Sequence, residues 1–171
     1  MAQGVEVLAT IPDWVVPTHE QVVAMLRSDS RRTSGDHAFG HQQAASWATD
    51  IISATPISRR SSDQPVSWNE ARAECWMAVC AAAEQPPPTA HEFALLGAPA
   101  RPSAATDPDY AHGVWQVLAW LLGERSTPPD PGVVLDLRLA HREYLELERL
   151  SRQRVEARQR CEQVRQRIAA R

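Results

Sequence analysis

Two histidines, His37 and His41, have the spacing of metal ligands on one face of a helix, and Asp36 precedes them. A zinc hydrolase with this spacing also has a glutamate as general base, in the pattern H-E-x-x-H, whereas this sequence reads H-A-F-G-H. Polar residues at the start of a helix explain the pattern more simply. We therefore expect no metal site and no cofactor.

A third histidine, His112, follows Asp109 and Tyr110 and has the chemistry of a general base, yet it also lies where a helix is expected to begin. The glycine patterns of phosphate-binding loops, the G-x-S-x-G of serine hydrolases and the EF-hand loop are absent from the sequence. The three cysteines form no C-x-x-C pair and have no zinc-site or disulfide spacing. The sequence therefore predicts a protein that is not an enzyme and has no catalytic residues.

Charge is unevenly distributed along the 171 residues. All 18 basic residues are arginines. Residues 1–148 carry 10 Arg against 19 Asp and Glu, a net charge of −9, whereas residues 149–171 carry 8 Arg against 2 Glu, a net charge of +6. A basic C-terminal segment of this kind is typical of contact with nucleic acid, with an acidic protein, or with the acidic body of the same chain.

Nucleic-acid binding through this segment would use unspecific contacts with phosphates. The apolar positions precede the arginines, which is the reverse of the order in a bZIP protein. A solvated arginine-rich helix surface is the simplest alternative. The candidate phosphate-binding residues are Arg152, Arg154, Arg158, Arg160, Arg165 and Arg167.

The pattern of apolar residues predicts an all-α fold, with a body of about five helices joined by proline-rich segments and followed by one long C-terminal helix. Capping boxes predict helix starts at Thr18, Ser67 and Thr89, each followed three residues later by Gln or Glu. Asp107 followed by Pro108 predicts a fourth start. A further helix is expected from His37 to about Ala54, before a proline.

The segment from Val133 to about Ala170 contains neither proline nor glycine and is rich in helix-forming residues. One helix over these roughly 38 residues would be about 57 Å long. A compact body of about 130 residues is roughly 36 Å across. The helix is therefore expected either to project from the body or to break. We divide the chain into a body, residues 1–131, and this C-terminal helix, residues 132–171.

An apolar seam with coiled-coil spacing runs along this helix, with a three-residue phase slip after Leu147. The seam favours pairing with another helix, mainly as a homodimer, while folding back on the body and a free helix stay open as alternatives. The predicted partner-binding residues are Leu137, Tyr144, Leu147, Leu150, Val164 and Ile168.

Two stretches 73 residues apart share the pattern D-x-A-x-G-x-x-Q-x-x-x-W-x8-P, over residues 36–56 and 109–129. On a helix, Gly40, Gln43 and Trp47 share one face, and their counterparts Gly113, Gln116 and Trp120 share another. The pattern indicates two equivalent helices that pack closely at the glycines, as halves of a duplicated unit, although chance similarity is the alternative.

These observations predict a non-enzymatic, cytoplasmic interaction module that self-associates or binds another helical protein through its C-terminal helix. Neither a secretory signal nor a membrane-spanning run is expected. The alternative is a small regulatory protein that binds nucleic acid through the arginines.

Overall fold

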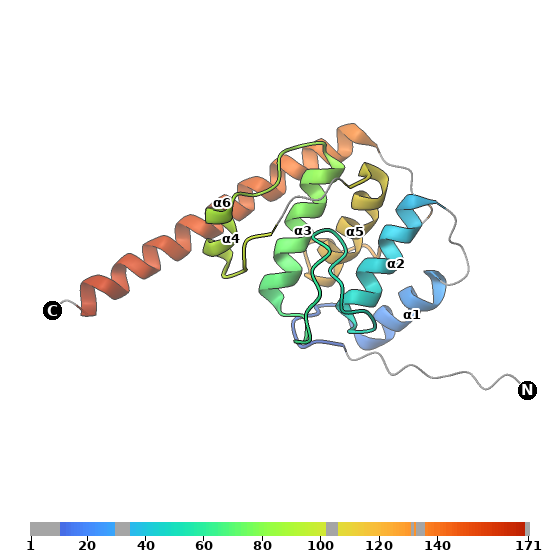
Figure 1. Cartoon of the computed structure of the whole chain (residues 1–171), viewed down its shortest axis with the longest axis horizontal. Helices are drawn as coiled ribbons and strands as arrows, with labels where there is room; N and C mark the ends of the chain where they lie inside the picture. Colours follow the sequence, from blue (N-terminus) through green and yellow to red (C-terminus); the bar gives the residue numbers. More distant parts are fainter. Residues whose placement is uncertain (1–10, 30–34, 102–105, 131, 133–135, 170–171) are drawn as a thin grey trace, which may run out of the picture.

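The computed structural model describes residues 11–29, 35–101, 106–130, 132 and 136–169. Within these ranges the chain is all-helical, which confirms the predicted fold class, and an isolated β-bridge joins Ala54 and Ser61. Figure 1 shows a helical body from which the C-terminal helix projects to one side. The helices are α1 (His19–Asp29), α2 (Asp36–Ala48), α3 (Trp68–Ala82), α4 (Ala90–Leu96), α5 (Pro108–Leu121) and α6 (Leu137–Ala169).

The predicted helix starts are confirmed by their caps. At α3 and α4 the side chains of Ser67 and Thr89 accept hydrogen bonds from backbone amides three residues on, and the glutamates at those positions bond back to complete capping boxes. Thr18 makes the equivalent pair of contacts before α1. Asp107 caps α5 through the amides of Asp109 and Tyr110. Local side-chain hydrogen bonds thus set these four boundaries.

The predicted end of α2 at about Ala54 is wrong, because the helix ends at Ala48. The Thr49 hydroxyl donates to the carbonyl of Ala45, and Asp50 adopts a φ of 62°, which reverses the chain. The following loop is held elsewhere: the buried Glu74 carboxylate on α3 accepts from the backbone amides of Ile57 and Ser58 at 2.8 and 3.1 Å. These hydrogen bonds compensate for removing the carboxylate from water.

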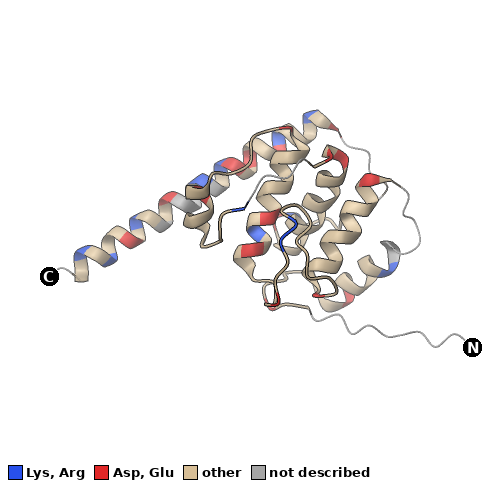
Figure 2. Cartoon of the chain, viewed as in Figure 1, with Lys and Arg blue, Asp and Glu red and all other residues tan. Residues whose placement is uncertain are grey.

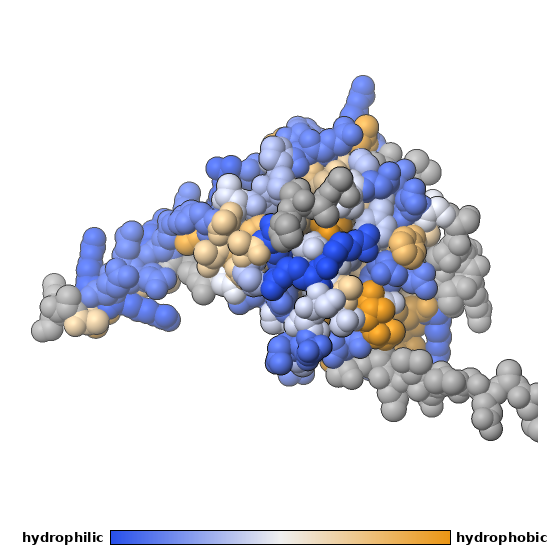
Figure 3. Space-filling view, in the orientation of Figure 1, coloured by the Kyte–Doolittle hydropathy of each residue, from blue (hydrophilic) through white to orange (hydrophobic). Residues whose placement is uncertain are grey.

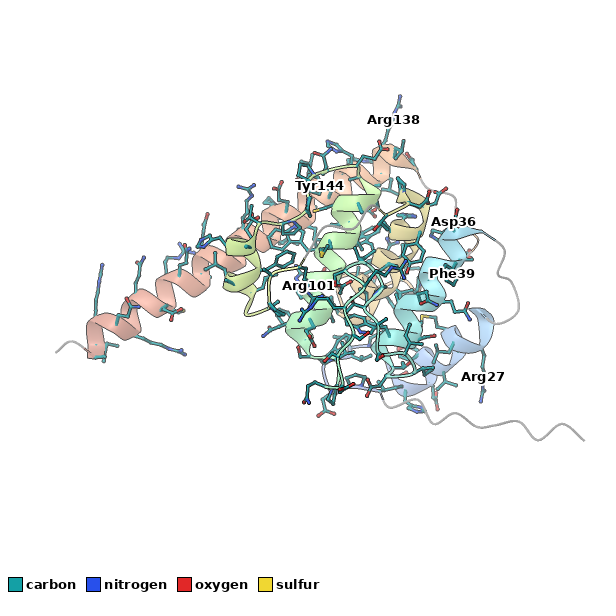
Figure 4. The ribbon with its side chains drawn as sticks, viewed as in Figure 1. Arg27, Asp36, Phe39, Arg101, Arg138 and Tyr144 are labelled. Carbon is teal, nitrogen blue, oxygen red and sulfur yellow. The ribbon has the colours of Figure 1, made fainter. Side chains whose placement is uncertain are left out.

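Arg101 completes the surroundings of Glu74. Its side chain is fully buried and forms an ion pair with that carboxylate, so the loop, α3 and the segment after α4 meet at one charged pair (Figure 4). A buried pair of this kind is costly to break because either partner alone would be an uncompensated charge. The pair thereby helps to hold the loop against α3.

The core lies between α2, α3 and α5. Every residue of α5 from Tyr110 to Leu121 is buried, as is α3 from Ala71 to Cys80. The most extensive contact between helices joins α2 and α5. The two helices cross so closely that only glycine fits at the contact. A Cβ atom on Gly40 would lie 2.1 Å from the carbonyl oxygen of Tyr110, and one on Gly113 would lie 2.1 Å from that of His37.

The first half of α6 packs along this body and the second half extends past α4 (Figure 1). Asp136 caps its start by accepting from the amides of Arg138 and Leu139. At 33 residues, α6 is about 50 Å long. Among the described residues, no helix is long and apolar enough to cross a membrane.

Candidate functional site

The part of the predicted seam from Ala140 to Leu147 is used by the chain itself. Ala140 and Leu147 are buried, Tyr144 packs against the core, and α6 contacts both α3 and α4. Figure 4 shows Tyr144 on the side of α6 that faces the body and Arg138 pointing away from it. The prediction that Leu147 contacts a partner is therefore corrected, because only 6% of its surface is exposed. The apolar face of this part of α6 therefore covers the hydrophobic core.

Basic and acidic residues follow one another along α6 (Figure 2), and two ion pairs form within the helix. Arg149 binds Glu146 at 2.6 Å, and Arg152 binds Glu148 at 2.7 Å. The hydrogen bond with Glu148 raises the pKa of Arg152, so this arginine is already engaged. Exposed pairs of this kind add little stability, but they neutralise the arginines nearest the body.

Beyond these pairs, α6 presents four exposed residues at 4-3-4 spacing, which we call the distal stripe: Ala157, Cys161, Val164 and Ile168. Val164 and Ile168 are 52% and 69% exposed, which is high for large apolar side chains. A shallow cleft lies between α4 and α6. The α6 side chains that line it are Arg152, Glu156 and Gln159. The distal stripe is not part of that cleft, and nothing in the described part of the chain covers Val164 or Ile168.

The predicted site residues are thus divided between the body and the solvent. Tyr144 and Leu150 are half-buried, whereas Leu137, Val164 and Ile168 are exposed. Of the candidate phosphate-binding residues, Arg152, Arg160, Arg165 and Arg167 are exposed, and the side chains of Arg154 and Arg158 lie outside the described residues. Figure 3 shows that the projecting part of α6 is predominantly hydrophilic on the face in view.

A cleft of about 260 Å³ between α3, α4 and α6 has no counterpart in the sequence analysis. It is lined by Trp76 and Cys80 of α3, by the prolines at 86–88, and by Tyr144 of α6. Burial raises the pKa of Cys80 to about 12, so its thiol stays protonated and unreactive at neutral pH. The lining comes from four separate segments, and no local pattern could have brought them together.

The glycine faces of α2 and α5 lie in contact, and the contacts are reciprocal under the 73-residue offset. The rings of His37 and His112 are 5.1 Å apart, and those of Phe39 and Tyr110, their counterparts, are 5.7 Å apart. Gly40 faces Tyr110 as Gly113 faces His37. This is the arrangement of two equivalent helices around a local two-fold axis. Descent from a duplicated unit stays a prediction.

In the described ranges, no group of three or more His, Cys, Asp or Glu side chains is placed so that it could hold a metal ion. Burial lowers the pKa of His112 to about 4, and the nearby His37 and Arg125 add to this effect. The neutral ring contacts the amide of Gln116 at 3.3 Å and is only 2% exposed. A general base must be able to contact a substrate, and the His112 ring is enclosed by other side chains. Its position is that of a residue packed between two helices.

No family model, curated protein or solved structure matches this chain.

Proposed function

We propose that this chain is a non-enzymatic helical interaction module that docks on a partner through the distal half of α6. The observation that carries the proposal is the exposure of Val164 and Ile168 on a helix that extends beyond its own body. A helix that left only polar residues in solvent would need no partner, whereas an apolar stripe at coiled-coil spacing is stabilised by a second helix. A cytoplasmic location is part of this proposal.

The test uses a fluorescently labelled probe peptide of 21 residues, with Leu at the a and d positions of each heptad and Gln at the flanking e and g positions. Its anisotropy is measured during titration with the full chain and with the Val164→Ser, Ile168→Ser double variant. Both positions are exposed, so thermal unfolding should be unchanged. We expect binding to the native chain and loss of at least about 10-fold in affinity in the variant, since two buried side chains are removed. Equal binding to both proteins, or to neither, would contradict the proposal.

A second function, contact with nucleic acid, is favoured by the exposure of Arg160, Arg165 and Arg167 on the same segment. The test measures how much of a 20-base-pair DNA duplex the immobilised chain retains at several salt concentrations. Phosphate binding predicts steeply weaker retention as salt rises and a further loss when these three arginines are replaced by glutamine. Retention that depends on neither would refute this second function.

A further inference from the structure

The residues that flank the distal stripe are the basis of this inference. In a heptad, the position after each d residue and the position before each a residue border the apolar seam on either side. With Ala157 and Val164 at d and Cys161 and Ile168 at a, the bordering residues are all arginines. They are Arg158, Arg160, Arg165 and Arg167.

Among the described side chains, no ion pair joins the two glutamates of this segment to an arginine. Glu156 and Glu162 occupy c and b positions, which lie outside the flanking rows. The arginines closer to the body, Arg149 and Arg152, are already paired with glutamates of α6. The edges of the distal stripe are thus positive on both sides over about three helical turns.

This charge pattern opposes pairing with a second copy of the chain. In a parallel coiled coil each flanking residue faces the flanking residues of the partner helix, and in an antiparallel one the same rows also meet. Both arrangements would place Arg against Arg at every flanking contact. Like charges at such positions weaken pairing, whereas opposite charges strengthen it and determine the partner.

We propose that the distal stripe selects an acidic amphipathic helix of another protein, with an apolar seam and Asp or Glu at its flanking positions. This inference rests on the proposed function and specifies its partner. The stripe spans about 17 Å from Ala157 to Ile168, which matches about three turns of a partner helix. Ala157 and Cys161 are small, so large partner side chains belong opposite them, and smaller ones belong opposite Ile168.

The test uses three probe peptides with the same Leu seam and with Glu, Gln or Arg at all flanking positions. A fourth peptide keeps the Glu content but has a scrambled seam. Binding to the full chain is followed by the methyl NMR signals of Val164 and Ile168, which report on the distal stripe directly. We expect the Glu peptide to bind about 10-fold more tightly than the Gln peptide, as four charge pairs each contribute slightly less than twofold. The Arg peptide should bind more weakly than the Gln peptide.

A charge-reversed chain, Arg160→Glu, Arg165→Glu and Arg167→Glu, serves as the matched control because all three side chains are exposed. It should prefer the Arg peptide over the Glu peptide. Equal binding of the Glu and Arg peptides to the native chain would overturn the acidic-partner inference and leave the proposed function standing. Methyl signals that no peptide shifts would overturn both. If the scrambled peptide bound as tightly as the Glu peptide, the preference would be unspecific charge attraction, and the inference would be overturned.

A second copy as the occupant is tested separately through Cys161, which is exposed and lies at a seam position. In a parallel homodimer the two Cys161 thiols would face each other and form a disulfide under mild oxidation. We expect light scattering to give the mass of one chain and oxidation to give no rapid dimer. A doubled mass, with a fast dimer linked through Cys161, would overturn the acidic-partner inference.

Discussion

The crossing of α2 and α5 gives the sharpest prediction of stability. Replacing Gly40 by Ala would place a methyl group 2.1 Å from the backbone oxygen of Tyr110. An ordinary contact of a Cβ atom begins at 3.4 Å, so the helices must separate by about 1.3 Å. A gap of about 1 Å forfeits up to half of the attraction of the atoms that line it. A backbone carbonyl cannot rotate aside, so the cost should be near the upper end for overpacking, about 3 kcal/mol.

The higher helix propensity of Ala offsets about 1 kcal/mol of this cost. The free energy of unfolding of the Gly40→Ala variant should therefore be about 2 kcal/mol lower than that of the native chain. Its thermal unfolding midpoint should fall by roughly 4–8 °C. Urea unfolding followed by tryptophan fluorescence measures the change, because Trp47 of α2 and Trp120 of α5 are both buried. A Gly40→Ala protein that is as stable as the native chain, or more stable, would refute the close crossing.

The reciprocity of the two glycines makes the double variant informative. Gly113→Ala should destabilise by a similar amount, because its methyl group would meet the His37 carbonyl at the same 2.1 Å. Once one alanine has separated the helices, the second meets less resistance. The double variant should fall short of the sum by about 1–3 kcal/mol. Gly132→Ala is the control: among the described residues its methyl group would meet the Asp130 side chain alone, at 3.3 Å, and the variant should stay within about 0.5 kcal/mol of the native chain.

Two further predictions concern titration and reactivity. Because the pKa of His112 falls from 6.5 to about 4 on folding, the unfolded chain binds more protons between these values, so stability should decline as pH falls from about 6.5 towards 4. Urea midpoints across this range measure the decline, and a His112→Gln variant whose midpoints decline as steeply would disprove this origin. In the native protein iodoacetamide should modify the exposed Cys161 alone, since burial raises the pKa of Cys75 and Cys80 to about 11 and about 12. Mass spectrometry should show one adduct natively and three after denaturation, and two or more native adducts would disprove the assignment.

The helix starts were predictable because capping is local. Thr18, Ser67, Thr89 and Asp107 each bond to amides within three residues, so the short sequence pattern contains the whole interaction. The end of α2 was not predictable in this way. It lies at Thr49 and Asp50 with no proline or glycine to mark it, and the loop that follows is held by Glu74, 16 and 17 residues further along the chain than Ser58 and Ile57.

At the candidate site, too, one property of the α6 seam was predictable from the sequence and another was not. Its spacing and its arginine-rich flanks are properties of the sequence, because helical periodicity alone assigns residues to faces. Which part of the seam stays exposed depends on where the body ends. Leu147 is buried in the core, whereas Val164 and Ile168 are exposed on the part of α6 that extends past the body.

The sequence by itself determined the helical class, the capped helix starts, the glycine faces and the charge asymmetry of this protein, since each depends on residues within a few turns of one another. Only the tertiary structure decided that Gly40 and Gly113 meet each other's backbones, that Glu74 is buried with Arg101, and that α6 keeps one half of its seam and presents the other. These outcomes depend on which distant surfaces exclude water together, and burial of that kind has no signature in local spacing.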